Sequence, residues 1–234
     1  MTSNRFKESR SQALQDLFVL AVTEKRNGFF LEIGGFHSEQ LSNTYLLEKS
    51  FGWRGVTVEY LPDNAAEIAS NRTATVLCQD ARTIRWSEKR TALAIPANLD
   101  YLQVDCEPPV SSLIALWRVV LSGLRPRVIT FEHDAYAGST LLGALPQGRV
   151  VRWCSRLLLR SLGYTLVAAN IATKSGKPFE DWWILGPQAR PKCASNAAVT
   201  NPDQFMHDNN LYAAYERLAQ TPKGDAPPRN SRKV

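Results

Sequence analysis

Two short apolar runs in this chain end in residues that can hold a ligand. The first run contains Glu32 and leads directly into Gly34-Gly35, and the second ends in Glu59. A helix-length stretch lies between the two runs and closes at Gly52. Glycines let a backbone approach a ligand closely, and a carboxylate accepts hydrogen bonds from ribose hydroxyls. This strand–turn–helix–strand pattern therefore predicts a site for a nucleoside.

Acidic and polar residues recur at the ends of the predicted strands. They are Glu32 with Gly34, Glu59, Asp80, Asp105 with Glu107, and Glu132 with His133 and Asp134. In parallel α/β sheets, ligands bind outside the carboxyl ends of the strands. We therefore expect these side chains to gather at one edge of a sheet and to line one site.

The hydrophobic pattern predicts strands that alternate with helices. Short β-prone runs predict strands over residues 29–33, 55–60, 74–78, 99–104, 127–131, 164–171 and 181–185. Helices are predicted over residues 11–25, 42–51, 110–121, 150–162 and 210–220, and another begins at Pro62. The basic stretch 82–90 is interpreted as a solvated connection or a short hairpin. This order predicts an α/β three-layer sandwich built on a parallel sheet, with a closing strand pair.

Composition places the chain among globular proteins of one domain. It has 234 residues, of which 44% are hydrophobic and 21% are charged. We predict an N-terminal helix in residues 1–28, a main domain over 29–190, a helical extension over 191–220 and a disordered basic tail over 221–234. That tail contributes much of the net charge of +6. A nucleic-acid partner is not expected, because no recognition motif accompanies the charge.

Cysteine spacing and hydropathy bear on the cellular location. The four cysteines are far apart and form no CxxC pair, which favours reduced thiols in a cytoplasmic protein. The first ten residues show no apolar segment of a secretory signal. No apolar run reaches the roughly 18–20 residues that span a bilayer. We therefore expect a cytoplasmic protein without a membrane partner.

A set of motifs, taken together, resembles the FkbM-type methyltransferases. In chain order they are Ser11-Gln12-Ala13-Leu14-Gln15-Asp16, Phe30-Leu31-Glu32-Ile33-Gly34, Leu41-Ser42-Asn43-Thr44-Tyr45, Gly52-Trp53-Arg54-Gly55-Val56-Thr57-Val58-Glu59, Asn71-Arg72, Asp100-Tyr101-Leu102-Gln103-Val104-Asp105, Phe131-Glu132-His133-Asp134, Gly163-Tyr164 and Glu180-Asp181-Trp182-Trp183. The resemblance implies a class I methyltransferase that depends on S-adenosyl-L-methionine (SAM) and acts on a hydroxyl of a sugar, glycan or small molecule. It also implies a Rossmann-like, mostly parallel seven-stranded sheet whose last strand is antiparallel.

The same resemblance assigns cofactor residues to three strand ends. Glu32, Gly34 and Gly35 would lie along the methionine end of SAM, Glu59 would hold the ribose, Tyr60 would lie against the adenine, and Asp80 and Ala81 would meet the adenine edge. The chain departs from the family where Phe36-His37-Ser38 replaces the more frequent Asn-Asp-Gly. This departure makes the glycine-lined approach to the cofactor bulkier.

Methyl transfer to a hydroxyl requires a group that removes the acceptor's proton. His133 is the best candidate by residue type, because a reference pKa of about 6.5 leaves much of it neutral in the cell. Asp105 and Glu107 would orient His133 or bind the acceptor. Alternatively, Asp105, Glu107 and Asp134 would hold Mg²⁺, which would acidify the acceptor hydroxyl.

Two other functions are open on the sequence alone. A non-catalytic binding domain would keep the scaffold, with Phe36 and Ser38 marking a decayed glycine loop. A nicotinamide-dependent oxidoreductase would also use the acid at the end of the second strand, but this chain lacks the GxGxxG turn of such enzymes. Gln12, Gln15 and Asp16 form either a lid over the site or the polar start of a helix.

Overall fold

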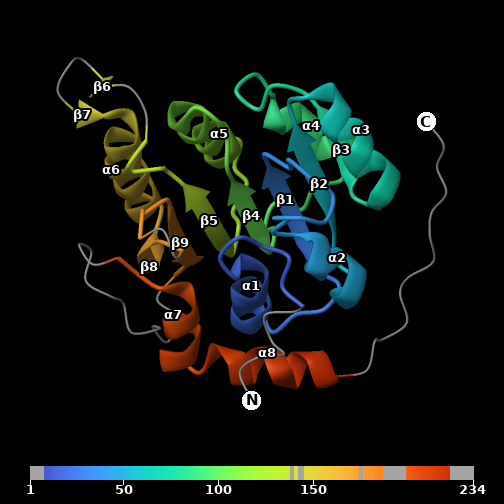
Figure 1. Ribbon diagram of the computed structural model, residues 1–234. Helices are drawn as coiled ribbons and strands as arrows, with labels where there is room; N and C mark the ends of the chain where they lie inside the picture. The colour runs from blue at the N-terminus through green and yellow to red at the C-terminus, as the bar shows by residue number, and fades with distance from the viewer. Residues whose placement is uncertain (1–7, 138–139, 142–144, 174–175, 187–198, 222–234) are drawn as a thin grey trace.

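The computed structural model describes residues 8–137, 140–141, 145–173, 176–186 and 199–221. Its centre is a seven-stranded sheet in the order β3-β2-β1-β4-β5-β9-β8 (Figure 1). The strands are β1 (Phe29–Ile33), β2 (Arg54–Glu59), β3 (Thr75–Cys78), β4 (Tyr101–Val104), β5 (Val128–Glu132), β8 (Tyr164–Ile171) and β9 (Glu180–Leu185). The other six strands of this sheet run in one direction, and β9 runs in the opposite direction between β5 and β8. The predicted fold, with its antiparallel closing strand, is confirmed.

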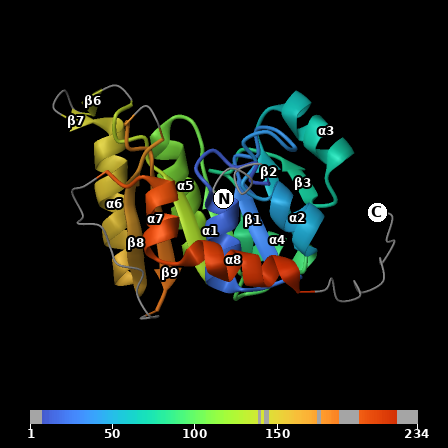
Figure 2. The same cartoon turned by 60° about the horizontal axis from the view of Figure 1, so that its bottom comes forward.

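Helices cover both faces of the sheet and enclose two separate apolar cores. On one face lie α1 (Gln15–Thr23), α2 (Tyr45–Phe51), α7 (Pro202–Asp208) and α8 (Leu211–Gln220). On the other lie α4 (Trp86–Ala92), α5 (Pro109–Leu121) and α6 (Gln147–Ser161). Figure 2 shows α8 lying across α1, and α3 (Pro62–Asn71) packs beside β2 and β3. Trp182 and Trp183 of β9 are both fully buried, one in each core, because successive side chains of a strand point to opposite faces.

Helix α2 ends where the sequence predicts but begins three residues later than the predicted residue 42. Gly52 closes α2 in the left-handed conformation, with φ of 71°. Ser42 does not begin that helix, but its Oγ accepts a hydrogen bond from the backbone N–H of Tyr45 at 3.1 Å and so supports the first turn.

The structure also contains elements that the sequence pattern does not predict. The basic stretch forms α4 rather than a solvated connection or hairpin, because Trp86 at its start is buried in the core and fixes the turn. Helix α7 and a small hairpin of β6 (Thr140–Leu141) and β7 (Leu145–Pro146) are further additions. None of the described helices has the length and hydropathy needed to cross a membrane. The predicted basic tail from residue 222 onward lies outside the described residues.

Candidate active site

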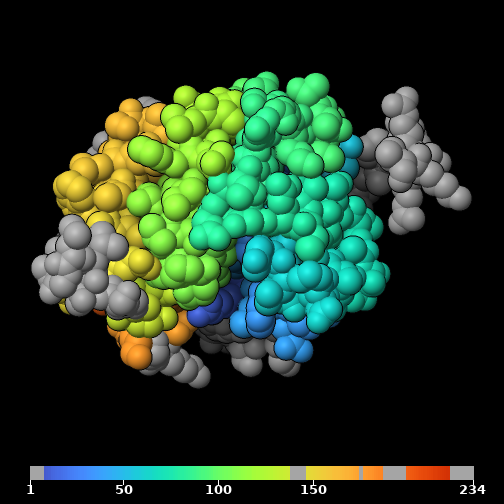
Figure 3. Space-filling model, turned by 90° about the horizontal axis from the view of Figure 1, so that it is seen from above, coloured from blue at the N-terminus to red at the C-terminus, as the bar shows by residue number. Residues whose placement is uncertain are grey.

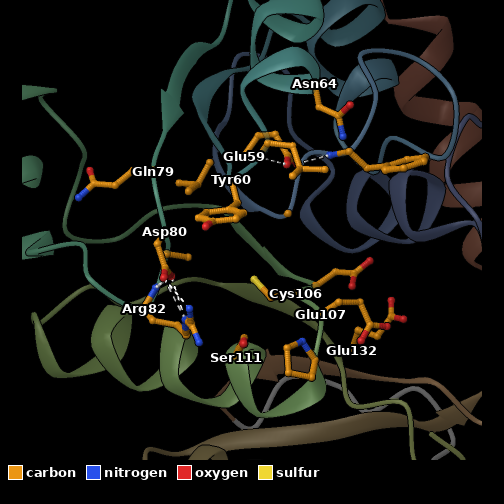
Figure 4. Close-up of a pocket in the computed structure, with 17 residues that line it drawn as sticks. Glu59, Tyr60, Asn64, Gln79, Asp80, Arg82, Cys106, Glu107, Ser111 and Glu132 are labelled. Atoms are coloured by element: carbon orange, nitrogen blue, oxygen red, sulfur yellow. Dashed lines mark hydrogen bonds and ion pairs between the residues drawn. The ribbon is translucent and has the colours of Figure 1, made fainter. Parts of the chain in front are cut away.

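A cavity of about 620 Å³ opens at the carboxyl edge of the sheet, above β1, β2 and β4. Seen from above, the molecule is hollowed between the segments coloured green and cyan (Figure 3). Seven residues predicted for the site line this cavity: Gly34, Glu59, Tyr60, Asp80, Ala81, Asp105 and Glu107. Glu59, Tyr60, Asp80 and Glu107 are labelled in Figure 4. The order of the strands reverses at β1, between β2 and β4, which is where α/β sheets bind ligands.

Gly34 follows β1 at the point where the backbone turns beneath the cavity. Its φ is +87°, and a Cβ atom there would lie 1.6 Å from the carbonyl oxygen of Asp105. Its N–H donates to the carbonyl of Val58 at 2.9 Å, which ties the turn to β2. Gly35 has a similar constraint, because a Cβ there would come within 2.5 Å of Thr57 Cγ2. Any larger residue at Gly34 would therefore have to displace the end of β4.

Glu59 ends β2 with its carboxylate held by two backbone groups. The N–H of Phe36 donates to one carboxylate oxygen and the N–H of Leu61 donates to the other, each at 2.8 Å. The residue is 7% exposed and lines the cavity. A carboxylate has about four acceptor positions, so two remain for a ligand. Glu59 is therefore a fixed acceptor of hydrogen bonds on the cavity wall.

The wall formed by the ends of β2 and β3 suits a flat ring. Tyr60 is exposed and, with Asp80 and Ala81, forms this side of the cavity (Figure 4). The Arg82 guanidinium binds both carboxylate oxygens of Asp80, at 3.0 and 2.7 Å, and lowers the pKa of Asp80 below its usual value. Asp80 is thus ionised and oriented by a cation that also lines the cavity.

The opposite wall, at the ends of β4 and β5, carries the carboxyl groups of Asp105, Glu107 and Glu132, and Asp134 is buried close to them. Asp105 and Glu132 lie close enough to affect each other's pKa, and Asp134 lies close enough to Glu107 to affect the pKa of Glu107. Burial and the charges of Asp134 and Glu59 raise the pKa of Asp105 to about 6. Partial burial and the neighbouring Asp134 raise the pKa of Glu107 to about 7. Carboxyl groups this close share protons at neutral pH, and a cation bound beside them would relieve their repulsion.

A second, smaller cavity of about 80 Å³ adjoins the first and shares Gly34, Phe36, Asp105 and Glu132 with it. Its other walls are rich in acceptors, and they include Gln12, Gln15, Glu32, Gly35, Asn43 and Gln103. Burial raises the pKa of Glu32, against the opposing charge of Arg72. The buried oxygens Asn43 Oδ1 and Gln103 Oε1 have no hydrogen-bond partner among the described residues. This chemistry suits a small cationic donor such as an ammonium group.

His133 does not join the other predicted residues. Its side chain is fully buried and lines neither cavity. Its Nδ1 accepts from the N–H of Ala135 at 3.2 Å, and its Nε2 lies 3.4 Å from Asp181, which Arg156 also binds. Glu132 faces the cavity, and because side chains alternate along an extended chain, the next residue points away from it. The structure therefore does not bring His133 to either cavity, and its role as the base stays a prediction.

The proposed magnesium ligands also lack the arrangement that a metal needs. Among the described residues, no three His, Cys, Asp or Glu side chains converge on a common point. Asp105 instead lies beside Glu132, and Glu107 beside Asp134, as two separate pairs. The donor set therefore does not fit Mg²⁺ as it stands.

Comparison with known proteins identifies the fold. No protein-family model matches the sequence, and no curated protein matches it. An O-methyltransferase from Bacillus cereus, solved in complex with S-adenosylhomocysteine (SAH), superposes with a TM-score of 0.52 and 17% identity, over 76% of this chain and 83% of its own. An SAH-bound methyltransferase from Podospora anserina gives a TM-score of 0.51 and 13% identity, over 80% of this chain and 83% of its own.

This is the class I methyltransferase fold.

Several residues that line the cavities carry no signal in the sequence that predicts them as site residues. Asn64 in the first turn of α3, Gln79 after β3 and Ser111 in the first turn of α5 line the larger cavity. Arg82 does so as well, although its basic stretch is interpreted above as solvated. Gln12 and Gln15 line the smaller cavity, whereas Asp16 is buried and accepts hydrogen bonds from Ser9, Ser11 and the Arg10 backbone.

Proposed function

We propose that this protein is a SAM-dependent methyltransferase. The observation that carries the proposal is the Glu59 carboxylate, fixed by the backbone N–H groups of Phe36 and Leu61 on the wall of a nucleoside-sized cavity at the reversal point of the sheet. The fold agrees with this activity. Since one fold hosts many functions, the residues of the site carry more weight than the fold does.

The residues of the two cavities fit the parts of SAM. Glu59 has free acceptor positions for the ribose hydroxyls, and Tyr60 offers a ring face for the adenine. Asp80 and Ala81 flank the adenine edge. The smaller cavity, with Glu32, Gly34 and Gly35 in its walls, offers unpartnered acceptors to the ammonium group of the methionine end.

SAM, when bound, supplies an electrophilic methyl group on a positively charged sulfonium. The carboxyl groups of Asp105 and Glu132 lie where the two cavities meet, so a cation bound there would lie beside them. Burial and the charges of neighbouring carboxylates raise the pKa values of both groups, and a bound cation would lower these values by stabilising the ionised forms. Cation binding is therefore expected to release protons from this wall.

Glu107 replaces His133 as our candidate for the base that takes the acceptor's proton. Glu107 lines the cavity, and its pKa of about 7 allows it to accept a proton near neutral pH. Asp134, which lies close enough to raise the pKa of Glu107, would position it. The remaining wall of the cavity near Glu107 would hold the acceptor.

The acceptor that we propose is a hydroxyl of a sugar, glycan or other small molecule. The support is the motif set that resembles the FkbM-type methyltransferases, together with a cavity of about 620 Å³, which has room for the cofactor and a small acceptor group. We further propose that transfer takes place in the cytoplasm. Because the carboxyl groups do not converge on one point, we propose no step that uses Mg²⁺.

The test is incubation with methyl-labelled SAM and fractionated metabolites, with and without Mg²⁺. We expect label in one fraction, transfer that does not need Mg²⁺, and loss of transfer in Glu107→Gln. A wild-type protein that binds SAM but labels no fraction would instead be the non-catalytic binding domain. Label on nitrogen rather than oxygen would overturn the acceptor class alone.

A further inference from the structure

Helices α5 and α6 pack against each other on the face of the sheet opposite α1 and α8. Their outward sides carry large apolar side chains in an unusual concentration: Ile114, Trp117 and Leu121 on α5, and Trp153 and Leu157 on α6. Trp117 is 56% exposed and Trp153 64%, whereas the other four tryptophans are fully buried. We call these five residues the α5–α6 patch.

The other exposed large hydrophobics of the described chain are explained differently. Phe36, Tyr60 and Leu61 line the larger cavity, and Leu41 lines the smaller one. Only Tyr136 and Val199 remain, at single positions elsewhere in the chain. Single exposed apolar residues are ordinary, whereas five of them on two helices that pack together point to an interaction surface. The α5–α6 patch is therefore the surface that requires an explanation.

The charge around the patch identifies the kind of partner. Neither α5 nor α6 contains an aspartate or a glutamate, and together they contain five arginines. Arg152 and Arg156 turn inward to Asn170 and Asp181. Arg118, Arg149 and Arg160 are exposed beside the patch. Among the described residues, neither Arg118 nor Arg149 forms an ion pair. An anionic partner would therefore meet only positive charge on these two helices.

We propose that the α5–α6 patch docks on an anionic membrane surface. Outward tryptophans and leucines flanked by arginines are the composition of helices that lie in the interface of a bilayer, with the cations on lipid headgroups. A second copy of this chain is disfavoured as the occupant, because it would bring two arginine-bearing faces together. A membrane partner is not expected from the sequence, since the patch forms only when two helices from separate parts of the chain lie side by side.

This inference does not depend on methyl transfer and is tested on the full chain. Sedimentation with vesicles of phosphatidylcholine, with or without an equal share of phosphatidylglycerol, measures binding at about 0.1 M salt. We expect binding to the anionic vesicles only. Trp117→Ser with Trp153→Ser should weaken it about tenfold or more, and Arg118→Gln with Arg149→Gln should weaken it to a comparable extent. Vesicles with brominated phosphatidylglycerol should quench the fluorescence of Trp117 and Trp153.

Three controls keep the test specific. Val199→Ser removes an exposed apolar residue elsewhere and should leave binding unchanged. Replacing Lys223, Arg229, Arg232 and Lys233 of the tail with glutamine should leave the tryptophan quenching in place. Thermal unfolding verifies that each variant is folded. The proposal is overturned if the wild type ignores anionic vesicles, or if only the tail variant loses binding. Sedimentation equilibrium that shows a dimer broken by the tryptophan variants would overturn it too, by assigning the patch to a second copy.

Discussion

The carboxylate of Glu59 accepts a hydrogen bond from the backbone N–H of Phe36 at 2.8 Å and so links the ends of β1 and β2. Phe36 itself has a φ of 50°, in the left-handed region that a non-glycine residue rarely adopts. Its side chain is 62% exposed and lines both cavities. The bulky Phe36 is therefore accommodated at the exposed rim of the two cavities, while Glu59 holds its backbone in place.

Gly34→Ala tests the tight approach of β1 to β4. The added Cβ would collide with the Asp105 carbonyl, so we expect a large loss of stability and of ligand binding. Gly123→Ala is the matched control, since Gly123 has a similar φ of +83° but a Cβ there would meet no atom within 4 Å. Left-handed backbone alone should cost Gly123→Ala about 1–2 kcal/mol. Chemical denaturation should show Gly34→Ala to be worse by about 1–3 kcal/mol, the usual cost of overpacking. Equal losses would contradict the collision.

Glu107→Gln tests the base. Glu107 has a pKa of about 7 and must be deprotonated to take a proton, so the rate of methyl transfer should rise as pH increases from 6 to 8. The variant should lose roughly 10²–10⁴-fold in rate and lose this rise with pH. Its affinity for SAM should change little. A variant that keeps the wild-type pH profile would assign the proton transfer to another group.

His133→Gln separates the two candidate bases. Because His133 is buried against Asp181 and lines neither cavity, its replacement should lower the melting temperature. The remaining folded protein should keep the pH profile of the wild type. If this variant stays stable but loses methyl transfer entirely, His133 reaches the acceptor after all.

Glu180→Gln tests the buried acid behind the smaller cavity. Burial raises the pKa of Glu180 to about 8, against hydrogen bonds from Trp182 and Gln15. The folded state therefore favours the protonated form of Glu180. Below the unfolded pKa of about 4.3 this group does not oppose folding, because it is protonated in both states. As pH rises from there through 8, the wild type loses free energy of unfolding, because only the unfolded state ionises readily. The variant removes this loss and should be more stable than the wild type at pH 8 by on the order of 2–4 kcal/mol. Urea denaturation at pH 5 and pH 8 measures the difference, and parallel curves for the two proteins would refute it.

The sequence predicts the sheet well because each strand is a short apolar run bounded by a turn. β1 and β8 have the predicted bounds, and Gly52 ends α2 as expected. α4 is not predicted, since only Trp86 in its seven residues is buried and one anchor produces no periodicity. α7 is equally short, with seven residues.

The sequence predicts the location of the site because the carboxyl ends of parallel strands meet at one edge of the sheet. The edge rule places Glu59, Asp80 and Asp105 at one cavity, although their individual roles stay predictions. The rule places His133 at this edge as well, but its side chain lines neither cavity. The rule gives the edge of the sheet and not the direction of each side chain beyond the last strand residue. Asn64 could not have been found, because its place on the cavity depends on how α3 packs beside β2.

Calorimetric titration of SAM into the wild type and Glu59→Gln tests the central claim most directly. Glu88→Gln is the control, because Glu88 is an exposed acid that pairs only with Arg85 among the described residues. We predict saturable binding to the wild type and to Glu88→Gln, and a Kd about 10–100-fold weaker for Glu59→Gln, as expected for the loss of a charge-assisted hydrogen bond. A folded wild type that binds no SAM at millimolar concentration, or a Glu59→Gln variant that binds as the wild type does, would contradict the account.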